Sequence, residues 1–190
     1  MKCLTPILAF LLLLTISESP VLGDNNNTRL VDHIDTLDQQ SRCHFAVRKI
    51  FEGDTDRGME ATLHDCANGV QRIKITFGLS RRDLIFRYLL INGTAAKAEV
   101  LERRYPSTAD GDADFDRPFR PNSRGVLHFD GVKLVSISSR QTLGIKDKNK
   151  NAKALAFINL VDAVRAALLS NDPHPEFEST SFLAGIFENG

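Results

Sequence analysis

The chain has 190 residues, and its 24 lysines and arginines balance its 24 aspartates and glutamates. Hydrophobic residues make up 42% of the sequence, which excludes an intrinsically disordered chain. The zero net charge excludes the strongly basic surface of a general nucleic-acid binder. These numbers indicate a globular protein, and by themselves they assign no function.

The first 23 residues have the pattern of a secretory signal peptide. Lys2 supplies the positive charge, residues 7–14 form an unbroken apolar stretch, and small residues precede a cleavage site. The apolar stretch is well short of the ~20 residues that a membrane-spanning helix needs. We therefore expect cleavage before Asp24 and a secreted, extracellular protein in which residues 24–190 form a single globular domain.

Removal of the signal peptide also removes Cys3 and leaves Cys43 and Cys66. An even pair of cysteines in an oxidising compartment predicts one disulfide bond. Residues 41–51 and 59–66 both have a helix-like pattern, with a break between them. We expect a disulfide-linked helical hairpin at the amino-terminal end of the domain, because antiparallel helices would bring the two cysteines to similar heights.

Two Asn-X-Thr triplets are sites for N-glycosylation. Asn26 belongs to a polar amino-terminal tail, and Asn92 begins an Asn-Gly turn. Tails and turns are exposed, so we expect a glycoprotein with a glycan on at least one of these asparagines.

The middle of the chain predicts a central antiparallel sheet. Residues 70–79 alternate apolar and polar side chains, and residues 84–91 form an apolar run that we interpret as a buried strand. The Asn-Gly pair at 92–93 suits a hairpin turn or a helix end, so residues 95–105 stay open between helix and strand. Residues 125–138 alternate on both sides of an Asp-Gly pair and predict a second hairpin.

Residues 152–170 give the clearest helix. The helix is apolar nearly all round, which predicts burial on most sides, and its narrow polar stripe consists of Lys153, Asn159, Asp162 and Arg165. The charges within this stretch argue against a membrane span. An apolar cluster follows at residues 182–187. The fold class that we expect is α+β, with a helical hairpin, a central sheet and a buried carboxy-terminal helix; an all-α bundle is the alternative.

One acidic stretch offers a weak calcium candidate. Its carboxylates recur at every second position, which allows them to converge on a cation if the loop curls: Asp110, Asp112, Asp114 and Asp116. The stretch lacks the glycine and the final glutamate of an EF-hand loop, and a solvated acidic loop is the simpler interpretation. The five histidines have no metal-binding spacing. We expect no metal and no cofactor.

The sequence contains no phosphate-binding loop, no dinucleotide-binding glycine pattern and no Gly-X-Ser-X-Gly motif. We therefore expect a protein that is not an enzyme and that acts by binding another extracellular protein, without a nucleic-acid partner. Two alternatives stay open. A helix packed over a sheet can enclose a small apolar ligand, which would make the protein a carrier, and a secreted hydrolase can assemble its residues without a motif.

Overall fold

A computed structural model describes residues 22–53, 55–138, 143 and 145–187. The signal-peptide prediction falls almost entirely on residues 1–21, which lie outside the described part of the chain. The helices and strands follow one another in the order α1 (Leu22–Gln40), β1 (Cys43–Gly53), β2 (Met59–Cys66), β3 (Val70–Leu79), β4 (Arg82–Ile91), β5 (Thr94–Arg104), β6 (Asn122–Asp130), β7 (Lys133–Ile137), α2 (Lys150–Leu169), β8 (Glu176–Phe177) and α3 (Ser179–Phe187).

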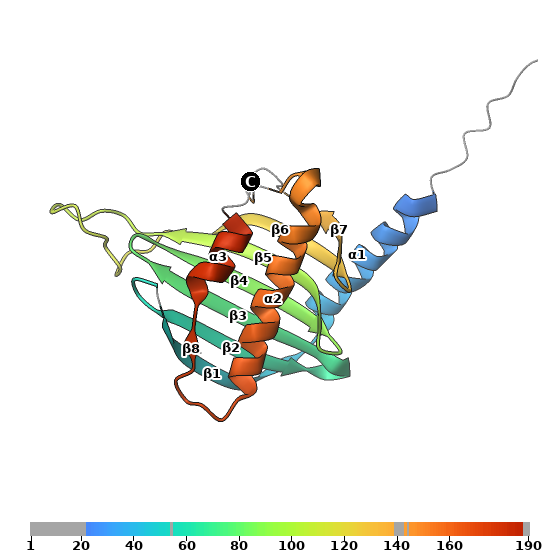
Figure 1. The fold of residues 1–190 in the computed structure, drawn as a ribbon, viewed down its shortest axis with the longest axis horizontal. Coiled ribbons are helices and arrows are strands. Elements are labelled where there is room, and N and C mark those ends of the chain that lie inside the picture. Colours follow the sequence, from blue (N-terminus) through green and yellow to red (C-terminus); the bar gives the residue numbers. More distant parts are fainter. Residues whose placement is uncertain (1–21, 54, 139–142, 144, 188–190) are drawn as a thin grey trace, which may run out of the picture.

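The described strands form one mixed sheet in the order β7-β6-β5-β4-β3-β2-β1-β8. Strands β1 to β7 are each antiparallel to the next in sequence, so they make a simple meander, and the two-residue β8 adds to β1 in parallel. Helices α2 and α3 lie across one face of the sheet, and α1 lies at one end of the molecule (Figure 1). The architecture is α+β, as expected, and the all-α alternative is wrong.

The predicted helical hairpin is also wrong, because residues 43–53 and 59–66 are the first two strands of the sheet. In β2, Met59, Ala61 and Leu63 are buried, and the residues between them are only partly buried. This period of two is that of a strand with one covered face. The segment is too short to separate such a pattern from a helical one by composition alone.

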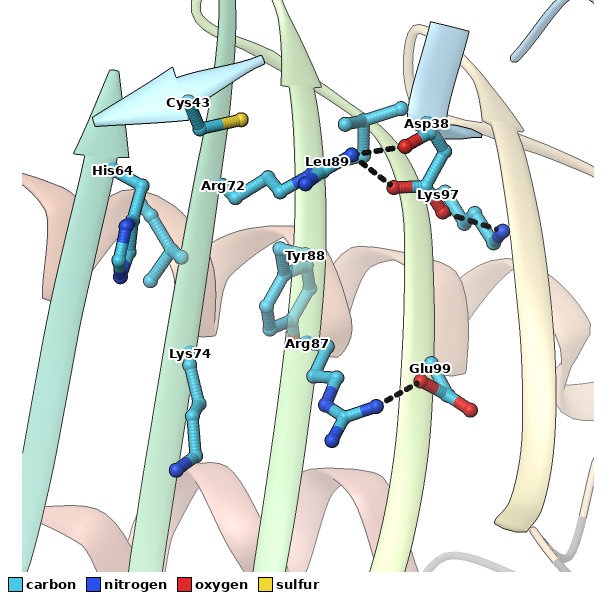
Figure 2. Close-up of a pocket in the computed structure, with 11 residues that line it drawn as sticks. Asp38, Cys43, His64, Arg72, Lys74, Arg87, Tyr88, Leu89, Lys97 and Glu99 are labelled. Carbon is cyan, nitrogen blue, oxygen red and sulfur yellow. Dashed lines mark hydrogen bonds and ion pairs between the residues drawn. The ribbon is translucent and has the colours of Figure 1, made fainter. Parts of the chain in front are cut away.

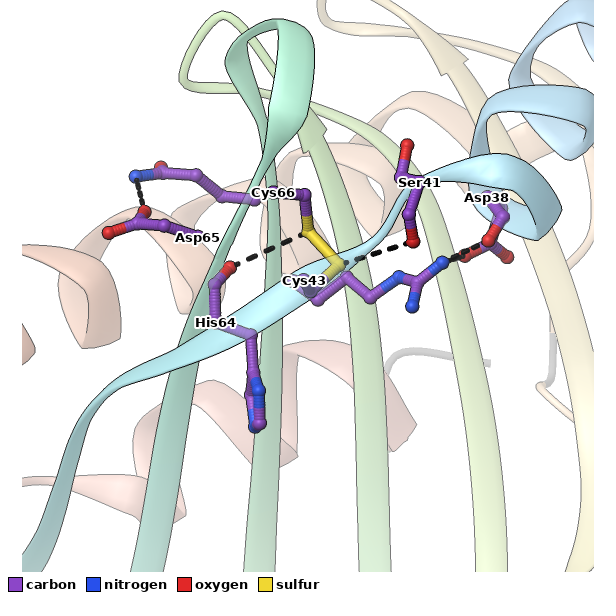
Figure 3. The surroundings of a disulfide bond; sticks show 8 residues. Asp38, Ser41, Cys43, His64, Asp65 and Cys66 are labelled. Atoms are coloured by element: carbon purple, nitrogen blue, oxygen red, sulfur yellow. Dashed lines mark hydrogen bonds and ion pairs between the residues drawn. A yellow bond between two sulfur atoms is a disulfide. The ribbon is translucent and has the colours of Figure 1, made fainter.

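The predicted disulfide is confirmed, on strands in place of helices. Cys43 and Cys66 are direct cross-strand partners with Cα atoms 4.0 Å apart, and their sulfur atoms are bonded. The bond joins the first residue of β1 to the last residue of β2 (Figure 3). It therefore links the open end of the β1–β2 hairpin, next to the carboxyl end of α1.

The remaining strand predictions are confirmed, and the open segment is resolved. Residues 70–79 and 84–91 are strands β3 and β4, and residues 94–104 form strand β5. Asn92 and Gly93, which join β4 to β5, have φ angles of 52° and 82°. A two-residue hairpin turn of this type requires positive φ at both positions, which Asn and Gly tolerate best.

The main core lies between the sheet and α2. Phe86 of β4 and Phe157 of α2 are completely buried with ring centroids 6.1 Å apart, and the Tyr88 hydroxyl donates to the Phe157 carbonyl at 3.0 Å. The predicted polar stripe on α2 is wrong at one position. Lys153 is only 1% exposed, and its ammonium donates to the carbonyl of Ile186 in α3. Burial lowers the pKa of this lysine.

Candidate binding face

Side chains alternate across each strand, so the face opposite α2 and α3 has its own set of residues. We call it the open face. Direct cross-strand pairs arrange its residues in three rows that run from β1 to β6. The row nearest α1 contains Phe45, His64, Arg72, Leu89, Lys97 and His128. The middle row contains Arg48, Thr62, Lys74, Arg87, Glu99 and Val126. The third row contains Ile50, Glu60, Thr76, Ile85, Leu101 and Ser123.

Helix α1 covers one end of the open face. Its Ile34 is buried in a second, smaller apolar cluster with Val70, Leu89 and Ala96. This cluster is separate from the main core on the other side of the sheet. The packing of α1 therefore divides the open face into a covered end and an uncovered middle.

Ion pairs and a hydrogen bond join α1 to the first row. The Lys97 ammonium lies 2.8 Å from a carboxylate oxygen of Asp35 and 2.8 Å from one of Asp38. His128 Nε2 lies 3.0 Å from Asp35 Oδ1, and the Arg72 guanidinium lies 3.4 Å from Asp38. We call these five residues the α1 latch.

The latch shifts the pKa values of two of its members. Burial alone would raise the pKa of Asp35, but hydrogen bonds from Lys97 and His128 outweigh it and lower that pKa. For Lys97, burial would lower the pKa, and the hydrogen bonds and charges of Asp35 and Asp38 raise it instead. The contact between α1 and the sheet thus stabilises the charged forms of both groups.

An open groove of about 450 Å³ lies on the open face beside α1. Figure 2 shows Lys74, Arg87 and Glu99 of this groove on neighbouring strands, with a helix ribbon behind the strands. Its lining carries four cationic side chains, two carboxylates and one histidine: Arg72, Lys74, Arg87, Lys97, Asp38, Glu99 and His64. The groove is therefore net positive in a chain whose net charge is zero.

The cations of the groove are not equally neutralised. Lys97 and Arg72 contact carboxylates of α1, and Arg87 lies 3.3 Å from Glu99. Lys74 is exposed and stands directly opposite Arg87 on the next strand. Among the described residues, no carboxylate lies within ion-pair distance of Lys74. Lys74 is the cation that remains available at the centre of the groove.

The β1 side of the open face carries two large apolar side chains in contact with solvent. Phe45 is 59% exposed and Ile50 is 57% exposed. The Phe45 ring meets the His64 ring edge-on, with centroids 5.8 Å apart. On the outer edge of β1, strand β8 pairs with Glu52 and Gly53 only, within the described part of the sheet. Cys43, which lines the groove, is fixed by its disulfide to β2.

The two predicted glycosylation sites are exposed. Asn26 belongs to helix α1, which begins at Leu22, so the expected polar tail is helical here. Asn92 lies in the turn between β4 and β5, and its backbone N–H donates to the carbonyl of Gly69 at 2.8 Å. Neither asparagine lines the groove.

The acidic stretch lies in the long loop between β5 and β6. Its backbone is held by hydrogen bonds such as that from Asp114 N–H to the Pro106 carbonyl at 2.8 Å, and the Asp114 carboxylate lies 3.9 Å from Arg117. Throughout the described residues, no three histidine, cysteine, aspartate or glutamate side chains are grouped closely enough to hold a metal ion. The calcium candidate, Asp110, Asp112, Asp114 and Asp116, is therefore not gathered into a site.

Sequence reasoning missed the basic groove, although two signals for it were present. Arg72 and Lys74 occupy the polar positions of the alternating segment 70–79, and Arg87 interrupts an otherwise apolar run. Their juxtaposition depends on the pairing of β3 with β4. That register becomes visible only when both strands and the turn between them are in place.

Among the described helices, none combines the length and the apolar character needed to cross a membrane. No protein-family model, curated protein or solved structure matches this chain.

Proposed function

We propose that the chain is a secreted, extracellular protein that binds another protein through the open face, without catalysis. The observation that carries this proposal is the uncovered middle of the open face. There, exposed Phe45 and Ile50 flank a net-positive groove whose central cation, Lys74, has no carboxylate partner among the described residues. Single exposed apolar residues are common on protein surfaces, so the proposal depends on the position of these two beside an open, net-positive groove.

The rigidity of this face supports the proposal. All the residues concerned lie on strands of one sheet, and the disulfide fixes the start of β1 to the end of β2. A surface that is already ordered loses little conformational entropy when it binds. The disulfide also fits an oxidising compartment, as the expected signal peptide requires.

The carrier alternative has little support from the packing. The space between α2 and the sheet, which the carrier alternative would use for its ligand, contains completely buried side chains: Phe77, Phe86, Phe157, Leu160 and Val161. An apolar ligand needs a concave space of its own. A pocket of about 460 Å³ does lie beside α3, but it is open to solvent and its lining mixes charged with apolar side chains, such as Arg82, Arg124 and Leu183.

Secretion is tested by expressing the full chain in cultured animal cells. We expect the protein in the medium, with a mature amino terminus at Asp24 and a mass that decreases on treatment with an N-glycosidase. Retention inside the cell, or an intact amino-terminal segment in the secreted product, would contradict the extracellular part of the proposal.

Binding through the open face is tested by photo-crosslinking. A photoreactive amino acid at Thr62, in the middle row, is expected to capture a discrete protein from extracellular fluid. The matched control is the same amino acid at Leu155, which is 47% exposed on α2 on the other side of the sheet. Equal capture from both positions, or none from Thr62, would contradict the assignment of the binding face.

A further inference from the structure

We infer that the groove on the open face takes an acidic, extended segment of the partner protein, with carboxylates at Lys74 and Arg87 and an apolar side chain against Phe45 and Ile50. This inference rests on the proposed function and specifies the chemistry of the partner.

The like-charged pair at the centre of the groove carries the inference. Lys74 and Arg87 are direct partners on antiparallel strands, a position at which Cβ atoms lie about 4.5–5.5 Å apart and equal charges destabilise the sheet. Arg87 has Glu99 at 3.3 Å on its other side, which leaves Lys74 uncompensated. Unfavourable local interactions of this kind are expected at binding sites, and a bound anion would relieve the repulsion between the two cations.

Two further cations border this pair. Arg72 is two residues before Lys74 on the same face of β3, and Lys97 lies across β4 in the first row. Both already contact carboxylates, namely those of Asp35 and Asp38 in α1. These intramolecular contacts show that cations of the groove bind carboxylates. Charge-assisted hydrogen bonds of this type are stronger than hydrogen bonds between neutral groups.

The mixed chemistry of the face favours a peptide over a sulfated polysaccharide. A highly charged polymer is bound by many unpaired cations, whereas here Glu60 and Glu99 lie among the cations and the whole chain is neutral. The exposed apolar residues of β1 have no role in binding a sulfated sugar. They suit an aliphatic or aromatic side chain next to a small number of carboxylates.

The strand spacing sets the spacing within the segment. Neighbouring strands lie about 4.8 Å apart, so the apolar side chains on β1 lie roughly 12 Å from the space between β3 and β4. An extended chain covers that distance in about four residues. The segment therefore has an apolar residue and an acidic residue about four positions apart.

The test measures the affinity of the mature protein for synthetic peptides by fluorescence anisotropy. The probe is a labelled peptide with one leucine and two glutamates, about four and six residues away, so that an extended chain presents all three side chains on one side. The matched peptide has glutamine in place of glutamate. We expect the glutamate peptide to bind at least about tenfold more tightly, and added salt to reduce this difference.

Three variants locate the binding on the protein. Lys74→Glu and Lys74→Met are expected to weaken binding of the glutamate peptide at least about tenfold, whereas Lys133→Glu leaves it unchanged. Lys133 is exposed at the start of β7, the outer strand at the opposite edge of the sheet, so its variant makes the same charge change away from the groove. Circular dichroism establishes that each variant is folded.

Equal affinity for the two peptides, or full affinity in folded Lys74→Glu, would overturn the inference. Binding of a heparin oligosaccharide that depends on Lys74, without binding of the glutamate peptide, would overturn it in favour of a sulfated glycan. Capture of a protein at Thr62, together with failure of the glutamate peptide, would leave the proposed function in place and remove only the acidic segment.

Discussion

At Lys74, one residue combines a cost in stability with a proposed role in binding. It stands across from Arg87 on the neighbouring strand, and the described part of the open face offers it no carboxylate. Opposite charges at such cross-strand positions stabilise a sheet by roughly 0.2–1 kcal/mol, and equal charges destabilise it. Lysine at position 74 therefore favours the proposed binding but lowers the stability of the unbound sheet.

Replacing Lys74 with glutamate is expected to raise the free energy of unfolding by about 0.5–1 kcal/mol, since a cross-strand ion pair with Arg87 replaces the like-charged pair. Lys74→Gln is expected to give part of this gain, because it removes the repulsion without adding an attraction. Urea denaturation at low and high salt measures both, and the gain should shrink as salt is added. A lower stability of Lys74→Glu would show that the two side chains avoid each other in solution.

Among the elements, the sequence predicts the strands in the middle of the sheet and fails at the first two strands, β1 and β2. Strands β3 and β4 were predictable because residues 70–79 alternate and residues 84–91 form an apolar run, and the Asp-Gly pair predicted the hairpin of β6 and β7. The Asn-Gly pair at 92–93 left a hairpin turn and a helix end both open. Strand β1 was misassigned as helix because most of its outer side is unpaired in the described sheet: β8 pairs only with its last two residues. Only Phe51 is fully buried in it, and a bulge between Phe45 and Val47 breaks the alternation.

Lys49 connects the edge strand to helix α2. Its ammonium donates to the carbonyls of Ala167, Ser170 and Asp172 at 2.9, 2.7 and 2.7 Å, at the carboxyl end of the helix. A cation there satisfies terminal carbonyls and interacts favourably with the helix dipole.

We expect Lys49→Met to lower the free energy of unfolding by about 2 kcal/mol, because the carbonyls lose a charged donor. Urea denaturation gives the value, and Lys133→Met at an exposed position is the matched control. A loss equal to that of the control would mean that water replaces the ammonium without cost.

The α1 latch makes the docking of α1 depend on pH. The folded-state pKa of Asp35 is lowered from an ordinary value of 3.8, so its contribution to stability is complete above that value and is lost as the pH falls through the folded pKa. The midpoint of thermal unfolding should therefore decrease as the pH is lowered from about 5 toward 2.

In Asp35→Asn, this decrease of the unfolding midpoint with pH should be shallower, because asparagine has no carboxylate that could be protonated. Asp32→Asn serves as the control, because Asp32 is exposed on the same helix and belongs to no ion pair among the described residues. Parallel pH profiles for Asp35→Asn and the unmodified protein would show that the latch contributes little. The side chain of Asp35 is 38% exposed, so solvent screens part of the effect.

At the scale of the whole molecule, the disulfide was predictable from two facts, an even number of cysteines and an expected signal peptide. The open face was not, because it depends on the pairing of six strands, β1 to β6, and on where α1 docks. The cysteines are separated by 23 residues, and closing a loop of that size stabilises the folded chain by about 3 kcal/mol in the chain-entropy model.

Replacing both cysteines with serine is therefore expected to lower the free energy of unfolding by about 3 kcal/mol, measured with urea. The same loss should appear in the unmodified protein under a reductant. Unchanged stability in both experiments would indicate that the edge hairpin retains its register without the covalent bond.

The position of the disulfide also bears on the opening of the molecule under native conditions. Only Ser41 and Arg42 separate the end of α1 from Cys43, so the disulfide keeps the carboxyl end of the helix close to the sheet. The remainder of the helix is held by the small apolar cluster and the α1 latch. Such a helix can detach as its own cooperative unit. In native-state hydrogen exchange, the amides of α1 should exchange together and faster than those of β3 and β4, and more so at acidic pH once the change in intrinsic exchange rate is subtracted. Each detachment would expose the part of the sheet that Ile34 now covers. The protein would then exist in two interconverting states, one of which has a longer open face.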